Sequence, residues 1–167
     1  GDTLCTRSGT NAEGTDRACL YLGTAAWMSV PQRRVGCFSA TATTGATLRW
    51  LVDLFDPAPG AVPAQAYQAL LREARSVEPG AKGLVFLPHL MGERGPENNP
   101  QAKGVLFGLT LAHGRPEITR AVLEGCALHI RSILEHLTVE PLREIAVVGG
   151  GAKSPLWRGI IADVSGI

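Results

Sequence analysis

Residues 144–155 read EIAVVGGGAKSP, and this stretch decides how the chain is expected to fold. The apolar run at residues 144–148 predicts a strand, and three consecutive glycines follow it. Ser154 suits the N-cap of a helix and Pro155 suits its first position. Glycines let a backbone come close to a ligand, and the first N–H groups of a helix favour phosphate. The stretch therefore predicts a strand, a glycine turn and a helix start that face a nucleotide.

Composition sets the class of protein. The 167 residues are 45% hydrophobic and 19% charged, which favours a packed domain or one lobe of a larger enzyme over disorder. The net charge is +1 without a basic cluster, so nucleic acid is not an expected partner. No signal peptide or bilayer-spanning run is apparent, so a cytoplasmic location is predicted and no membrane partner. Four widely spaced cysteines and four histidines lack metal-ligand spacing, so no protein metal site is predicted.

The order of apolar patterns predicts a mixed α/β protein with ligands at the strand ends. The chain opens on Gly1-Asp2 without a methionine, and we expect it to be a piece of a longer polypeptide. The predicted elements are a short helix at 2–8, strands at 18–22, 36–40, 83–87 and 144–148, helices at 45–55, 63–74 and 116–137, a final helix from 155, and a long loop over 88–115.

Two common nucleotide motifs fit the glycine turn poorly. A P-loop needs a glycine directly before its lysine, but Ala152 precedes Lys153. The dinucleotide fingerprint matches loosely from Gly149 to Ser154, and its acidic ribose partner is expected about 20 residues further on, past the last residue. A dinucleotide-binding dehydrogenase module therefore stays as an alternative.

A third pattern involves a set of motifs in a fixed order. The motifs are Gly1-Asp2, Leu22-Gly23-Thr24, Gly45-x-x-x-Arg49-Trp50-Leu51, the segment FLPHLMGERGP at 86–96, Gly104-x-x-x-Gly108-Leu109, RAVLEG at 120–125, GGGAKS at 149–154 and ADVSG at 162–166. In this order they resemble the C-terminal lobe of the FGGY carbohydrate kinases, most closely the xylulokinase-like members.

The resemblance implies a fold, a reaction and partners. It implies an α/β, actin-like ATPase (ribonuclease H-like) fold, in which residues 1–167 form the C-terminal nucleotide-binding lobe and the N-terminal sugar-binding lobe is absent. The implied reaction transfers the γ-phosphoryl group of ATP, with Mg²⁺, to a sugar hydroxyl, such as that of a pentulose like xylulose. The expected partners are the sugar and ATP, with a homodimer left open. A non-catalytic actin-like interaction module is a further alternative.

The resemblance also implies roles for single residues. Asp2 would be the catalytic base that accepts the hydroxyl proton, although an aspartate there also suits a helix N-cap. Gly23 and Thr24 would contact the β- and γ-phosphates. Gly45 and Arg49 would flank the nucleotide from a helix start, although a solvated helix face explains Arg49 equally well.

The glycine turn would hold the adenosine end of the nucleotide, through Gly150, Gly151, Ala152 and Ser154. We expect a Gly151→Val substitution to block ligand approach and to spare most of the fold. Lys153 is expected to face solvent.

Five other residues invite predictions. An ion pair between Glu93 and Arg94 would order the long loop, and a substrate role for the pair is the alternative. Arg120 and Glu124 have the spacing of an ordinary helix pair. His129 is expected at the surface or at the edge of the core.

Overall fold

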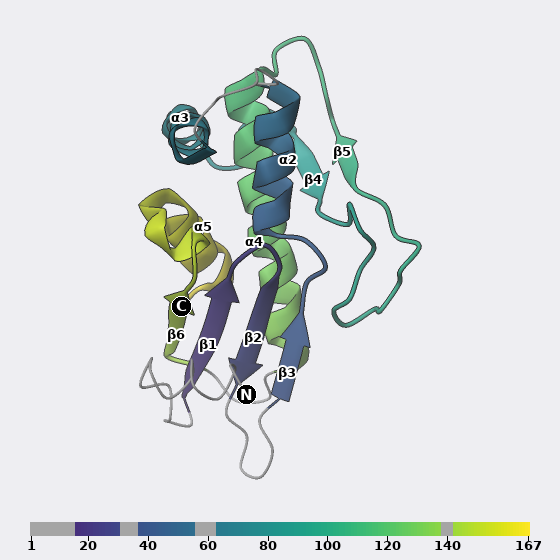
Figure 1. The fold of residues 1–167 in the computed structure, drawn as a ribbon, viewed down its shortest axis with the longest axis vertical. Helices are drawn as coiled ribbons and strands as arrows, with labels where there is room; N and C mark the ends of the chain where they lie inside the picture. Colours follow the sequence, from purple (N-terminus) through teal and green to yellow (C-terminus); the bar gives the residue numbers. More distant parts are fainter. Residues whose placement is uncertain (1–15, 31–36, 56–62, 138–141) are drawn as a thin grey trace.

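A four-stranded mixed sheet forms the lower part of the computed structural model, in which residues 16–30, 37–55, 63–137 and 142–167 are described (Figure 1). The strand order is β3-β2-β1-β6. The strands are β1 (Arg17–Leu22), β2 (Ala26–Val30), β3 (Cys37–Ala40) and β6 (Glu144–Val148). β1 to β3 pair antiparallel, whereas β6 pairs parallel to β1.

The register of the sheet puts two strand ends side by side. Tyr21 pairs with Val148 near the carboxyl ends of β1 and β6, and because these strands are parallel, the turns that follow them lie at one edge. Alternate residues of β1 (Ala18, Leu20 and Leu22) are buried and belong to the main hydrophobic core. The apolar pattern therefore fixes both the register and the position of the edge.

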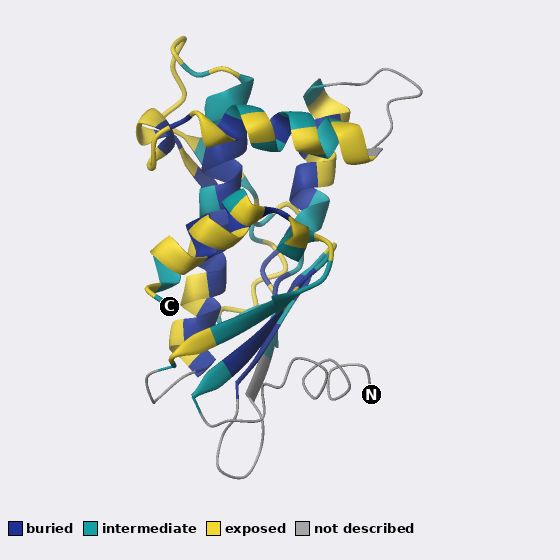
Figure 2. Ribbon diagram, turned by 90° about the vertical axis from the view of Figure 1, so that its left-hand side faces the viewer, coloured by how far each residue is buried: buried dark blue, intermediate teal, exposed yellow. Residues whose placement is uncertain are grey.

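The long helix α4 (Arg115–Leu137) is the centre of the packing. Apolar residues at helical spacing predict one buried face, and five of the six are buried while Ile118 is partly buried; the five are Val122, Cys126, Ile130, Ile133 and Leu137. Helices α2 (Gly45–Phe55), α3 (Pro63–Arg75) and α5 (Pro155–Ser165) pack against it. Figure 2 shows the resulting band of buried residues along α4, with exposed residues on the outer helix faces.

A second, two-stranded sheet pairs β4 (Val85–Leu87) with β5 (Val105–Phe107) in antiparallel register. It follows a 3-10 turn at Ala81–Gly83 and packs its β4 strand on α4. The contact is close, since a Cβ added at Gly125 would lie 2.2 Å from the Phe86 carbonyl oxygen. Glycine at 125 therefore lets the helix approach the strand.

The predicted elements are confirmed where the structure describes them, with ends shifted by one or two residues. Two strands were missed. β5 falls within the predicted loop over 88–115, and three residues between glycines give no alternation to detect. β2 was missed because only a three-residue turn separates it from β1. The predicted helix at 2–8, with Asp2, lies outside the described residues. In the described ranges no helix is long and apolar enough to cross a membrane.

Candidate nucleotide site

Two glycine-containing turns meet at the carboxyl end of the sheet. The turn at residues 23–25 follows β1, and the turn at residues 149–151 follows β6. Gly149 has φ +95°, and a Cβ added there would lie 2.7 Å from the Leu22 carbonyl oxygen. Glycine is required because both the left-handed backbone and the close approach exclude a side chain. We call these two turns and the start of α2 the glycine edge.

The first residues of α2 complete the glycine edge. The Gly45 amide donates to the Gly23 carbonyl at 2.9 Å, and the Ala46 amide donates to the Thr24 carbonyl at 2.9 Å. A Cβ added at Gly45 would lie 2.4 Å from the Gly23 oxygen, so only glycine permits this contact. The structure thus brings together Gly23, Thr24 and Gly45, which are far apart in the sequence. Thr24 is exposed.

Helix α5 begins as the sequence predicts. The Ser154 hydroxyl accepts a hydrogen bond from the Trp157 amide at 3.2 Å, and Pro155 occupies the first turn. A 3-10 turn at Gly151–Lys153 joins the strand to the helix. Ser154 is buried by this capping role, whereas Lys153 is exposed as predicted. The cap holds the amino end of α5 toward the glycine edge.

The last two glycines of the turn play different structural parts. Gly150 has ordinary helical angles (φ −61°, ψ −40°), and a Cβ added there would meet nothing within 4 Å. A Cβ at Gly151 would lie 2.6 Å from Leu22 Cγ and 3.1 Å from a Trp157 ring carbon. The expectation that Gly151→Val spares the fold is therefore wrong, because the new side chain points into the core. Gly150 is the glycine that borders open space.

Arg49 lies one turn along α2 from Gly45, on the exposed face of the helix. Its Nε donates to both carboxylate oxygens of Asp53 at 3.0 Å. This hydrogen bond, with the charge of Asp53, raises the pKa of Arg49. Arg49 therefore has a partner on its own helix, and its contact with a nucleotide stays a prediction.

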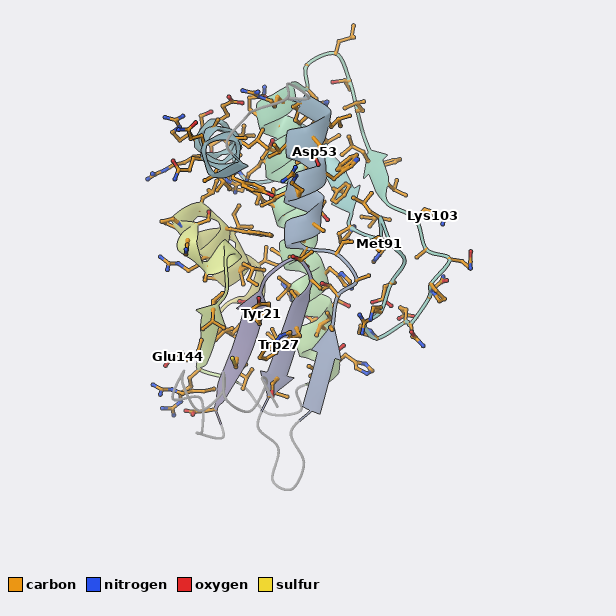
Figure 3. The ribbon with its side chains drawn as sticks, in the orientation of Figure 1. Tyr21, Trp27, Asp53, Met91, Lys103 and Glu144 are labelled. Atoms are coloured by element: carbon orange, nitrogen blue, oxygen red, sulfur yellow. The ribbon has the colours of Figure 1, made fainter. Side chains whose placement is uncertain are left out.

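An aromatic pair next to the edge was missed from the sequence. Tyr21 and Trp27 stack with ring centroids 5.5 Å apart, and Figure 3 shows them on neighbouring strands of the sheet. They are cross-strand partners in the β1–β2 hairpin. A Cβ added at Gly23 would lie 2.3 Å from the Tyr21 ring. Recognising the hairpin would have revealed the pair, because its register places the two residues opposite each other.

A run of buried threonines leads into α2 and was also missed. The hydroxyls of Thr41 and Thr44 lie 2.6 Å apart, and the Ala26 amide donates to Thr41 Oγ1 at 2.9 Å. The Thr43 hydroxyl donates to the Pro88 carbonyl at 2.8 Å. The segment ties the start of α2 both to the sheet and to the loop after β4. Its sequence signal is the cluster of threonines directly before Gly45.

Glu93 has a different partner from the predicted one. Its carboxylate Oε1 accepts from the Gly95 amide and lies 3.0 Å from His129 Nε2, whereas Arg94 is exposed. The predicted Glu93–Arg94 ion pair is therefore wrong. Of the two positions predicted for His129, the surface is wrong and the edge of the core is confirmed, because the residue is 9% exposed and faces this carboxylate from α4. Burial alone would raise the pKa of Glu93, but hydrogen bonds from His129 and Gly95 outweigh it and lower the pKa.

The Arg120–Glu124 pair does more than an ordinary helix pair. Arg120 Nε donates to Glu124 at 2.6 Å, and its second nitrogen reaches the Val77 carbonyl at 3.2 Å. Glu124 also accepts from the Gly80 amide at 3.0 Å. The pair is mostly buried and anchors the connection between α3 and β4 on α4.

A pocket of about 520 Å³ opens in the loop after β4, lined among others by His89, Glu93 and Asn98. It shares no lining residue with the glycine edge.

Within the described ranges, no three His, Cys, Asp or Glu side chains gather in the geometry of a metal site. Asp2, the predicted base, lies outside the described residues. The described part of the site is therefore made of backbone turns and hydroxyls.

Comparison with known proteins assigns the family. The family model described as the FGGY family of carbohydrate kinases, C-terminal domain, matches residues 15–167. Xylulose kinase of Escherichia coli (strain K12) is 45% identical over 101 residues, covering 59% of this chain and 21% of that protein. Gluconokinase of Bacillus licheniformis is 37% identical over 127 residues, covering 72% of this chain and 25% of that protein.

Solved structures agree on the fold. Xylulose kinase from Rhodospirillum rubrum superposes with a TM-score of 0.83 and 29% identity over 98% of this chain and 36% of that chain. The structure of Plasmodium falciparum glycerol kinase with ADP superposes with a TM-score of 0.84 and 19% identity, over 99% of this chain and 37% of that chain. The fold is the α/β, actin-like ATPase fold of the sugar kinases. The chain spans only about a fifth to a third of these relatives. Over the matched residues, it belongs to the FGGY family of carbohydrate kinases.

Proposed function

We propose that this chain is the C-terminal nucleotide-binding lobe of an ATP-dependent carbohydrate kinase. The observation that carries the proposal is the glycine edge, where two turns from distant parts of the sequence and the start of α2 converge. Backbone turns and helix starts of this kind favour phosphate groups. Phosphoryl transfer depends mainly on positioning and charge stabilisation, and the hydrogen-bonded backbone at the edge would position the phosphates.

Different residues of the glycine edge would contact different parts of the nucleotide. The exposed Thr24 and the Gly23 backbone would face the β- and γ-phosphates, with Gly45 allowing the helix to stand close behind them. Gly150 leaves open space for the adenosine end beside the capped start of α5, together with Gly151, Ala152 and Ser154. Arg49 would flank the nucleotide after release from Asp53. Each of these contacts is part of the proposal.

Mg²⁺ is the metal proposed with ATP. It keeps several waters and binds largely through substrate phosphates, so it needs few protein ligands. The described residues fit that mode, since the exposed Thr24 and Gly150 border the space proposed for the phosphates and the adenosine end. Asp2 would accept the proton of the attacking sugar hydroxyl. When bound, the metal would neutralise charge that develops on the phosphates.

The sugar is proposed from the relatives. Proteins named xylulose kinase and gluconokinase both match the chain, and the higher identity of the E. coli xylulose kinase favours a pentulose. Most of the polypeptide of these relatives has no counterpart here. We therefore expect the chain alone to bind ADP weakly and not to phosphorylate xylulose. Phosphorylation of a pentulose by the 167-residue chain alone would contradict this division of labour.

Amide hydrogen exchange with Mg-ADP tests the proposal. We expect slower exchange at residues 23–24, 45–46 and 149–151 when ADP is added, both in this chain at high ADP and in a two-lobed kinase that carries it. NAD is the matched control, and protection by NAD alone would instead support a dehydrogenase module. Folded protein with no protection by either nucleotide, even with the other lobe restored, would favour a non-catalytic interaction module.

A further inference from the structure

The loop between β4 and β5 is fastened to the core at two buried points. At its start, the Pro88 carbonyl accepts from the Thr43 hydroxyl at 2.8 Å. Further along, Glu93 Oε1 lies 3.0 Å from His129 Nε2 on α4, and both side chains are more than nine-tenths buried. One fastening therefore joins the loop to the segment before α2, and the other joins it to α4.

Hydrogen bonds within the loop connect these two points. The Gly92 amide donates to the His89 carbonyl at 3.2 Å, and the Glu93 amide donates to the Asn99 carbonyl at 2.8 Å. The His89 ring meets the His129 ring edge to face, with centroids 5.1 Å apart. The Gly95 amide also donates to the Glu93 carboxylate. Pro88 and Glu93 are thus parts of one compact turn system.

The first fastening leads directly to the glycine edge. Thr43 precedes Thr44 and Gly45, whose amides donate to the carbonyls of Thr24 and Gly23 at 3.0 and 2.9 Å. A hydrogen-bonded path therefore runs from the Pro88 carbonyl through Thr43 to these two bonds. The backbones are in close contact at Gly45, because an added Cβ would lie 2.4 Å from the Gly23 oxygen.

We propose that Glu93 is a positioning residue for the glycine edge, acting from His129 through Pro88 and Thr43 on the turn at Gly23 and Thr24. The carboxylate sets where the loop sits on α4, and the loop sets where the start of α2 sits against the phosphate turn. The inference deepens the proposed function and rests on it only for the meaning of the turn as a phosphate contact.

The test measures amide exchange at Gly45 and Ala46 in the ligand-free 167-residue chain. Glu93→Ala removes the acceptor for His129 and Gly95, which leaves two donors without partners. We expect exchange at Gly45 and Ala46 to rise about 3- to 10-fold more than at buried amides of α4. Glu93→Gln keeps a carbonyl acceptor for both donors, and it should restore most of the protection.

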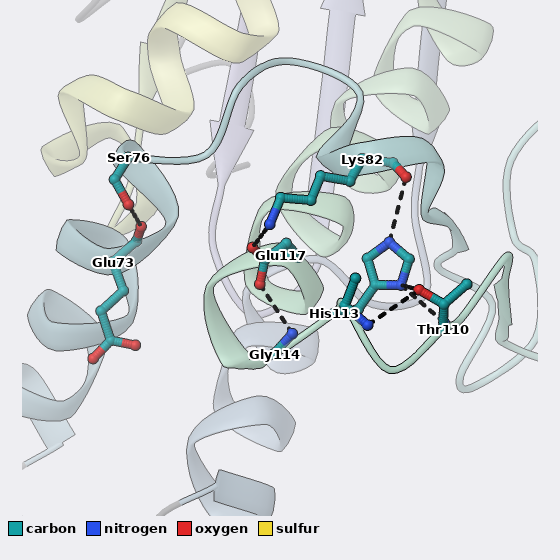
Figure 4. Close-up of polar contacts among 8 residues, drawn as sticks. Glu73, Ser76, Lys82, Thr110, His113, Gly114 and Glu117 are labelled. Carbon is teal, nitrogen blue, oxygen red and sulfur yellow. Dashed lines mark hydrogen bonds and ion pairs between the residues drawn. The ribbon is translucent and has the colours of Figure 1, made fainter.

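The matched control is Glu117→Gln. Glu117 also makes an inter-element pair, with Lys82 at 2.7 Å and the Gly114 amide at 2.9 Å, but it lies in the cluster with Thr110 and His113 (Figure 4). Its substitution should leave exchange at Gly45 and Ala46 within about twofold of the original chain, as for sites without shared partners. Equal increases in the exchange rates of the Gly45 and Ala46 amides in Glu93→Ala and Glu117→Gln would overturn the proposal.

A double-mutant cycle tests the route. Thr43→Val keeps the side-chain shape but removes the hydroxyl bond to Pro88. If the signal passes through this bond, Glu93→Ala adds no further exchange at Gly45 in the Thr43→Val background. Additive effects would overturn the route. Should Glu93→Ala fail to fold, Thr43→Val decides alone, since unchanged exchange at Gly45 and Ala46 then refutes the linkage.

The readout separates this proposal from the proposed function. Exchange in the ligand-free chain reports only the position of the turn, whereas ADP protection reports the nucleotide site. Coupled exchange without ADP protection would uphold the linkage and refute the nucleotide role. Protection by ADP without a response of Gly45 and Ala46 exchange to Glu93→Ala would uphold the nucleotide role and refute the linkage.

Discussion

A valine at position 150 and a valine at position 151 should have opposite effects on the molecule, although the two glycines are neighbours. At Gly150 the backbone angles suit any residue, and the added side chain meets open space. At Gly151 even the first added carbon would lie 2.6 and 2.7 Å from Leu22 side-chain atoms. Leu22 and Trp157 are both almost fully buried, so neither has room to move aside.

The magnitudes follow from packing. Overpacking a dense core costs about 1–3 kcal/mol, so Gly151→Val should lower the free energy of unfolding by about that amount. For a domain of this size that corresponds to a drop in Tm of roughly 2–12 °C. Gly150→Val should change the free energy of unfolding by less than about 0.5 kcal/mol, as is usual for exposed sites. Gly150→Ala should be neutral or stabilising by up to about 1 kcal/mol, because it restricts the unfolded chain.

Thermal and urea unfolding measure the stability difference, and calorimetric titration with Mg-ADP measures the site. In any form of the protein that binds ADP, Gly150→Val should weaken binding at least about tenfold, or 1.4 kcal/mol, by filling the space beside the turn. A Gly150→Val protein as unstable as Gly151→Val would refute the packing argument. A stable Gly150→Val protein with unchanged ADP affinity would refute the assignment of the nucleotide to this edge.

Three further predictions concern titration and reactivity. Burial lowers the pKa of His129 below 6.5, so the unfolded chain takes up a proton first as the pH falls below 6.5. The free energy of unfolding should therefore decline below pH 6.5. In a series of urea denaturations at different pH values, His129→Gln should flatten that decline, and an unchanged decline would contradict the argument. Hydrogen bonds from Lys82 and the Gly114 amide lower the pKa of Glu117 to about 2 from 4.5. The ionised carboxylate therefore stabilises the folded chain fully above pH 4.5, and this stabilisation disappears between pH 4.5 and 2. An acid-unfolding curve unchanged by Glu117→Gln would contradict this. Burial raises the pKa of the Cys126 thiol to about 12, so little reactive thiolate forms at pH 8. Peptide mapping after iodoacetamide treatment at pH 8 should therefore find Cys126 unmodified in the folded chain and modified in urea. Labelling at equal rates in both states would show that α4 is not packed as described.

Local patterns were enough to predict most elements and the glycine turn after β6. The helix at α4, the capped start of α5 and the strand β6 follow from periodicity and capping, which act between near neighbours in sequence. The convergence of Gly23, Gly45 and the β6 turn was anticipated only through the family resemblance. Its physical basis, the parallel pairing of β1 with β6, is a long-range contact that no local pattern encodes.

What escaped prediction depends on side-chain partners across the fold. Glu93 was paired with its sequence neighbour Arg94, but burial of the loop against α4 selects His129 instead. A valine at Gly151 was expected to spare the fold, but a Cβ added there would lie 2.6 Å from Leu22 Cγ in the core. Sequence patterns indicate which residues form a turn. The direction in which each Cα–Cβ bond would point is set by the tertiary packing.

The parallel pairing of β1 with β6 has a consequence for biosynthesis. Arg17 pairs with Glu144, so the two turns of the glycine edge come from opposite ends of the described chain. During translation the first turn leaves the ribosome long before its neighbour exists, and contacts of such large separation form slowly. A growing chain therefore has no assembled edge until β6 emerges and docks beside β1. If the edge binds ATP as proposed, ATP would stabilise only molecules in which β6 has docked beside β1.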